Sequence, residues 1–121
     1  MSTEKWLALE EEGGKVFLVQ IVEETIKIKG LGVFNPAELL AEKQVGETVV
    51  IGQKILTVLT PRLPELYRGM KRRAQTISAK DAGIFITKLG IGAGDVILEA
   101  GLGSGGLSLH LARVLGNSGT L

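Results

Sequence analysis

Residues 96–106 read Val-Ile-Leu-Glu-Ala-Gly-Leu-Gly-Ser-Gly-Gly, and this segment decides the fold. Residues 95–99 form a short apolar run of the kind found in strands that are buried on both faces of a parallel sheet. Four glycines follow between positions 101 and 106. Residues 107–115 then carry the apolar spacing of a helix. A strand, a glycine loop and a helix in this order predict a ligand-binding turn, because the N-terminus of a helix offers free N–H groups and a partial positive charge.

Two ligand-binding patterns overlap in the glycine loop. Gly101, Gly103 and Gly106 fit the G-x-G-x-x-G spacing of dinucleotide-binding loops. Glu99, Gly101, Gly103 and Gly105 fit the acidic-x-G-x-G-x-G pattern of class I methyltransferases. The carboxylate favours the second pattern, since it would repel a pyrophosphate but could hold the cationic amino-acid end of S-adenosylmethionine. A dinucleotide remains the alternative ligand.

A helix is predicted directly upstream of this segment. Ser78 followed by Asp81 fits a capping box, in which the serine side chain bonds a backbone N–H of the first turn. The apolar positions that follow have the i, i+3, i+4, i+7 spacing of one helix face. They are Ala82, Phe85, Ile86 and Leu89. Residues 81–121 therefore read as the beginning of a Rossmann-like domain, which we expect to be incomplete.

The first half of the chain predicts β-structure. Residues 15–29 are rich in β-branched and apolar side chains, with a turn at Gly13-Gly14 and another expected at Glu23-Glu24. Asn35-Pro36 indicates the start of a short helix. Residues 48–51 and 55–59 read as a hairpin. Residues 1–61 are thus predicted to form a small N-terminal domain resembling a β-barrel, and the fold class of the chain is predicted to be α+β.

Residues 62–80 form a basic connector between the two predicted domains. The connector has six Lys or Arg residues and one Glu, although the formal net charge of the whole chain is only +1. Clustered basic side chains supply sequence-independent affinity for nucleic-acid phosphates. The candidate RNA-binding residues are Arg68, Lys71, Arg72, Arg73 and Lys80.

Composition excludes several other classes of protein. The chain of 121 residues has no cysteine, so disulfides and thiolate metal sites are excluded, and we expect no metal site. No apolar run is long enough for a membrane span, and the N-terminus has no signal-peptide pattern, which favours a cytoplasmic protein. His110 is the only histidine and has no partner at catalytic or metal-binding spacing. We therefore expect His110 to be structural.

Two longer segments carry a resemblance to a known family. They are Met70-Lys-Arg-Arg-Ala-Gln-Thr-Ile-Ser-Ala-Lys-Asp-Ala-Gly83 and Ile91-Gly-Ala-Gly-Asp-Val-Ile-Leu-Glu-Ala-Gly-Leu-Gly-Ser-Gly105. Together with the upstream β-rich half, they resemble the tRNA (adenine-N1)-methyltransferases that modify the T-loop. The resemblance implies methyl transfer from S-adenosylmethionine to N1 of an adenine in tRNA, by a homo-oligomer.

The resemblance also implies which residues line the cofactor site. Gln75 and Ile77 would lie near its mouth. The residues that would line the site itself are Glu99, Gly101, Gly103, Ser104, Gly105 and Gly106.

The chain departs from the family pattern at three places. Ser78-Ala79 stands where the family commonly has Tyr-Pro, and Leu102 stands where it usually has Thr. The acid that binds the cofactor ribose and the catalytic Asp would both lie at or beyond Leu121. We therefore expect an N-terminal fragment that is inactive alone and prone to self-association. The alternatives are a non-catalytic tRNA-binding or assembly subunit of such an enzyme and a fragment of a dinucleotide-binding enzyme.

Overall fold

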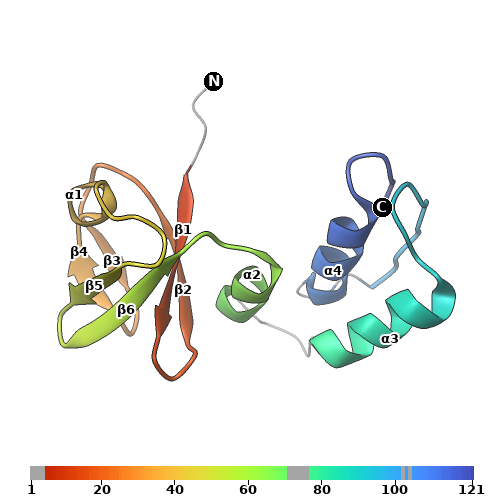
Figure 1. Cartoon of the computed structure of the whole chain (residues 1–121), viewed down its shortest axis with the longest axis horizontal. Helices are drawn as coiled ribbons and strands as arrows, with labels where there is room; N and C mark the ends of the chain where they lie inside the picture. The colour runs from red at the N-terminus through yellow and green to blue at the C-terminus, as the bar shows by residue number, and fades with distance from the viewer. Residues whose placement is uncertain (1–4, 71–76, 102, 104) are drawn as a thin grey trace. The chain divides into compact units, whose positions relative to one another are not determined.

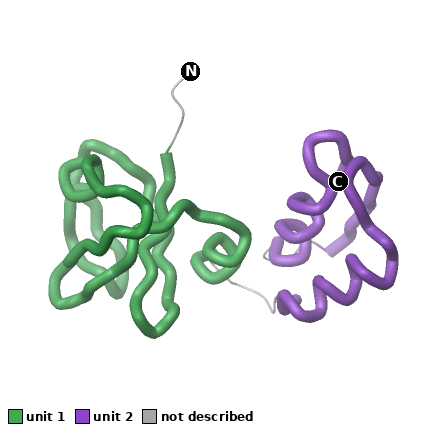
Figure 2. Tube along the Cα trace, in the orientation of Figure 1, with its two compact units in different colours: residues 1–70 green, residues 71–121 purple. Residues whose placement is uncertain are grey.

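The computed structural model describes residues 5–70, 77–101, 103 and 105–121. The chain divides into two compact units, residues 1–70 and residues 71–121 (Figure 2). Unit 1 is mostly β and unit 2 is mostly helical in its described part, so the predicted α+β class is confirmed (Figure 1). The elements of unit 1 are β1 (Trp6–Glu11), β2 (Val16–Gln20), β3 (Ile26–Ile28), β4 (Gly32–Phe34), α1 (Pro36–Leu40), β5 (Thr48–Ile51), β6 (Lys54–Leu59) and α2 (Leu63–Gly69). Those of unit 2 are α3 (Ala79–Leu89) and α4 (Gly106–Leu115).

The strands of unit 1 form two antiparallel sheets. The larger sheet has the order β2-β1-β6-β5, and β3 pairs with β4 in the smaller one. The hairpin predicted from residues 48–59 is present as β5 and β6, with Val49 opposite Leu56. The prediction that β2 would pair across Glu23-Glu24 is wrong. β2 pairs instead with β1 across Gly13-Gly14, and β1 lies in the interior of the sheet. Strand β1 was not predicted, because its sequence is rich in acidic residues.

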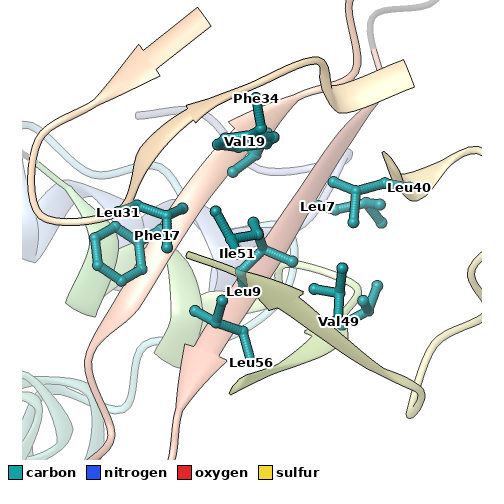
Figure 3. Close-up of a cluster of buried hydrophobic side chains, with 11 residues drawn as sticks. Leu7, Leu9, Phe17, Val19, Leu31, Phe34, Leu40, Val49, Ile51 and Leu56 are labelled. Atoms are coloured by element: carbon teal, nitrogen blue, oxygen red, sulfur yellow. The ribbon is translucent and has the colours of Figure 1, made fainter. Parts of the chain in front are cut away.

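Side chains from both sheets and from α1 enclose one apolar core (Figure 3). In β5 the side chains of Val49 and Ile51 are buried while that of Val50 is exposed, which is the period of two of a half-buried strand. The core consists of Leu7, Leu9, Phe17, Val19, Leu31, Phe34, Leu40, Val49, Ile51, Leu56 and Val58.

Helix α1 begins with a local signal that the sequence shows. Asn35 caps α1, and its Oδ1 atom accepts a hydrogen bond from the backbone N–H of Glu38 at 3.3 Å.

Helix α2 packs against β2, and a Cβ atom at Gly69 would lie 2.6 Å from Cγ of Leu18. Glycine at position 69 therefore allows the end of α2 to approach the sheet closely.

In unit 2, residues 95–99 do not form the buried strand that was predicted. They make a single parallel bridge between Val96 and Thr120, with hydrogen bonds from Ile97 N to Thr120 O (2.8 Å) and from Thr120 N to Asp95 O (3.0 Å). The exposed fractions of Val96 and Leu98 are 78% and 96%. A parallel strand is buried when neighbouring strands and helices cover both faces, and in the described part of unit 2 this segment has one bridging residue beside it.

The predicted apolar face of α3 is also largely uncovered. Ala82 is buried, whereas Phe85 and Leu89 are 44% and 71% exposed. Helix α3 packs against α4, and this contact is too small to cover four positions. The apolar spacing correctly predicted the helix. The surface that would bury its apolar face, however, is not provided by the described residues of unit 2.

The predicted cap of α3 gives a direct test of this helix. Ser78 Oγ accepts from the backbone N–H of Asp81 at 3.2 Å. We expect Ser78→Ala to lower the free energy of unfolding of unit 2 by about 1 kcal/mol. Urea unfolding followed by the NMR amide signals of residues 77–121 would measure this loss. Ser118→Ala, an exposed serine that caps no helix, is the matched control. Equal stability of the two variants would contradict the capping role.

Candidate cofactor site

The glycine loop owes its composition to backbone conformation. Gly101, Gly103 and Gly105 have φ angles of +76°, +57° and +82°. Side chains are disfavoured in this left-handed region, which glycine adopts without steric cost. A Cβ atom built on any of the three would meet no described atom within 4 Å. The glycines are therefore needed for the turn itself, and the space beside the loop backbone is open.

The loop delivers the chain into the N-terminus of α4. Gly105 is the N-cap residue and Gly106 is the first residue of the helix, and no side chain of the described residues caps this turn. The first backbone N–H groups of a helix lack intrahelical partners and favour anionic groups. The start of α4 can therefore accept a carboxylate or another anion.

His110 stabilises the same turn from within the helix. Its ring is buried, and Nδ1 donates to the backbone carbonyl of Gly106 at 2.8 Å. This contact fits the structural role expected from the sequence.

Glu99 places a carboxylate beside the start of α4. Its Oε1 atom accepts a hydrogen bond from Ser108 Oγ at 2.6 Å. Its Oε2 atom is buried and has no hydrogen-bond partner among the described residues. A buried charged oxygen without a donor is costly, and such an atom in a native protein calls for a partner. A cationic or N–H donor brought by a ligand fits this position.

The remaining predicted cofactor residues are placed only in part. Ile77 is half-buried and directly precedes the Ser78 cap of α3. Gln75 and Ser104 lie outside the described residues. Ser108, by contrast, is a site residue that the sequence reading missed. The available signal was its position in the first turn of α4, nine residues after Glu99, where a hydroxyl can reach back to the end of the preceding segment.

The predicted RNA-binding residues fall in different surroundings. Lys80 is exposed in the first turn of α3. Arg68 lies in α2 and is held by unit 1. Its guanidinium is 3.8 Å from Glu10 and 3.7 Å from Glu65, and Nη1 donates to the Gly14 carbonyl at 3.4 Å. These neighbours already offset much of the charge of Arg68. Contact of Arg68 with RNA remains a prediction.

The other predicted basic positions, Lys71, Arg72 and Arg73, lie outside the described residues. In the part of the chain that the structure describes, no group of three or more acidic or histidine side chains converges as a metal site would require. The same ranges contain no helix of the length and apolarity needed to cross a membrane.

An acidic residue, three glycines with positive φ and a helix without a side-chain cap form the arrangement expected of the cofactor loop of a class I methyltransferase. The comparison with family models agrees with this class. The model described as tRNA methyltransferase complex GCD14 subunit matches residues 54–121, and the chain belongs to this family. The resemblance seen in the sequence is thereby confirmed.

Related sequences extend the match to unit 1. The chain is 38% identical, over 93% of its length, to the tRNA (adenine(58)-N(1))-methyltransferase TrmI of Thermus thermophilus, and it covers 44% of that protein. It is 36% identical over 62 residues to the tRNA (adenine(57)-N(1)/adenine(58)-N(1))-methyltransferase TrmI of Methanocaldococcus jannaschii. The chain thus spans less than half the length of the curated relatives it matches.

Solved structures show the same relationship in three dimensions. A SAM-dependent O-methyltransferase of Thermotoga maritima superposes with a TM-score of 0.75 at 30% identity, and the match covers 98% of this chain and 44% of that one. The tRNA (m1A58) methyltransferase TrmI of Aquifex aeolicus gives a TM-score of 0.64 at 25% identity, covering 99% of this chain and 47% of that one. These methyltransferases share the fold of the part that the chain spans.

Proposed function

We propose that this chain supplies the N-terminal unit and the cofactor loop of an S-adenosylmethionine-dependent tRNA adenine-N1 methyltransferase. The observation that carries the proposal is the buried Glu99 Oε2 atom without a partner, beside the glycine loop and the start of α4. The names of the relatives, which are tRNA (adenine-N1)-methyltransferases, support the reaction.

The residues present fit the amino-acid end of S-adenosylmethionine. This end carries an ammonium and a carboxylate. Glu99 would hold the ammonium, and the free N–H groups at the start of α4 would hold the carboxylate. The cofactor, when bound, supplies an electrophilic methyl group. The chain's own residues bind and orient the cofactor, whereas the same Glu99 carboxylate would repel the pyrophosphate of a dinucleotide.

Transfer RNA is the proposed substrate, and the basic segment is its proposed contact. Lys80 and the neighbouring Lys71, Arg72 and Arg73 would bind phosphates of the RNA backbone. Exposed apolar side chains of unit 2, among them Leu98 and Leu89, support association between copies of the chain. A cytoplasmic location belongs to the same proposal.

Titration calorimetry with S-adenosylmethionine, and with NAD as the control ligand, tests the proposal. We expect binding of S-adenosylmethionine and no heat above dilution with NAD. The non-catalytic alternative instead predicts tRNA affinity that falls steeply with salt, together with no affinity for either small ligand. Selective binding of NAD would overturn the proposed cofactor.

A further inference from the structure

We propose that Ser108 is the positioning residue for Glu99, and that its hydroxyl reserves one carboxylate oxygen for the cofactor ammonium. The inference rests on the proposed function, because it assigns a role within the same cofactor site. Neither the spacing of the glycine loop nor the acidic-x-G-x-G-x-G pattern includes position 108.

The hydrogen bond itself is the first step of the argument. Ser108 has one hydroxyl hydrogen, and it donates to Glu99 Oε1 at 2.6 Å, a distance typical of a charge-assisted bond to a carboxylate. Ser108 stands on α4, so its position is fixed by a helix rather than by the loop. The bond therefore holds the Glu99 side chain in one orientation relative to the helix start.

The second step concerns the other carboxylate oxygen. Because Ser108 occupies Oε1, the atom left without a donor in the described structure is Oε2, and that atom is buried. A contact that served only to tie residues 95–99 to α4 would not require a charged group with one buried oxygen unsatisfied, since a neutral side chain could accept from Ser108 at lower desolvation cost. The pair is arranged as an oriented acceptor that still needs a cation.

A double-mutant cycle on the affinity for S-adenosylmethionine tests whether Ser108 acts through Glu99. NMR titrations of the 121-residue chain would compare the wild type, Ser108→Ala, Glu99→Gln and the double variant. Ser108→Thr keeps the hydroxyl, and Ser118→Ala removes an exposed hydroxyl in the turn that follows α4. We expect Ser108→Ala to weaken binding about 10-fold in the wild-type background and less than about twofold in the Glu99→Gln background. Ser108→Thr should restore binding, and Ser118→Ala should leave it unchanged.

The outcomes separate this inference from the proposed function. If the wild type binds the cofactor but Ser108→Ala binds equally well, or loses affinity equally in both backgrounds, the positioning role is overturned and the proposed function stands. If the wild type does not bind S-adenosylmethionine, the proposed function fails and the positioning role falls with it. Loss of folded amide signals in Ser108→Ala, without rescue of binding by Ser108→Thr, would assign the hydroxyl to folding and overturn the inference.

Discussion

Replacing Glu99 by alanine is expected to weaken the binding of S-adenosylmethionine about 100-fold, which corresponds to about 2.7 kcal/mol. The substitution removes the carboxylate whose buried Oε2 atom has no partner among the described residues. Without this carboxylate, the ammonium of the cofactor would lose a charge-assisted hydrogen bond in a partly desolvated site, where such bonds are strongest. No other acidic residue lies between Asp95 and the end of the chain.

The stability of the same variant should change in a different way from its affinity. An unsatisfied buried carboxylate oxygen opposes folding, so Glu99→Ala should keep or raise the free energy of unfolding of unit 2 while binding is lost. Calorimetry would measure the affinity, and urea unfolding followed by NMR would measure the stability. Asp81→Asn is the matched control, because it removes an exposed negative charge from α3 of the same unit and keeps a polar side chain in the first turn of the helix. A large loss of stability in Glu99→Ala with unchanged affinity would show that the carboxylate is structural.

Features that depend on residues close together in the sequence were predicted correctly. The Asn35-Pro36 helix start, the Ser78 cap and the hairpin of β5 and β6 each depend on residues within a few positions of one another. Strand β1 was missed because its interior position depends on neighbours distant in sequence, β6 among them. Its acidic end reads as solvent-exposed, although Leu9 in the middle of the strand is fully buried.

The candidate site shows the same division. Glu99 and the glycines of the loop could be predicted, since the spacing and the need for positive φ are both visible in sequence. The partner of Glu99 could not, because the hydrogen bond from Ser108 exists only once α4 has folded back beside residues 95–99. Burial of Val96 and Leu98 was predicted wrongly for a related reason. An apolar run indicates side chains that another element could bury, but it does not show whether the described part of unit 2 contains that element.

Gly119 is a further residue whose importance only the structure shows. A Cβ atom built at this position would lie 2.6 Å from Leu115 Cβ, 2.8 Å from the Leu115 carbonyl oxygen and 2.9 Å from the Asp95 carbonyl oxygen. Two of these neighbours are backbone atoms, and both already accept hydrogen bonds, from Gly94 N and Thr120 N respectively. They cannot retreat without loss of the contacts that join the end of α4 to residues 94–97.

We therefore expect Gly119→Ala to lower the free energy of unfolding of unit 2 by about 3 kcal/mol, at the upper end of overpacking costs. Hydrogen exchange of the amides of Ile97 and Thr120 would measure the loss. Trp6, the single tryptophan, lies in β1, so its fluorescence should show that unit 1 unfolds as in the wild type.

Gly92→Ala is the matched control for this prediction, because a Cβ atom at Gly92 would meet no described atom within 4 Å. Unchanged exchange at Ile97 and Thr120 in Gly119→Ala would mean that α4 and residues 94–97 can separate at little cost. The expected loss would instead show that close contact at Gly119 holds in place the segment that carries Glu99. In that case the affinity for S-adenosylmethionine should fall together with the stability of unit 2. In Glu99→Ala, by contrast, the affinity should fall while the stability is kept or raised.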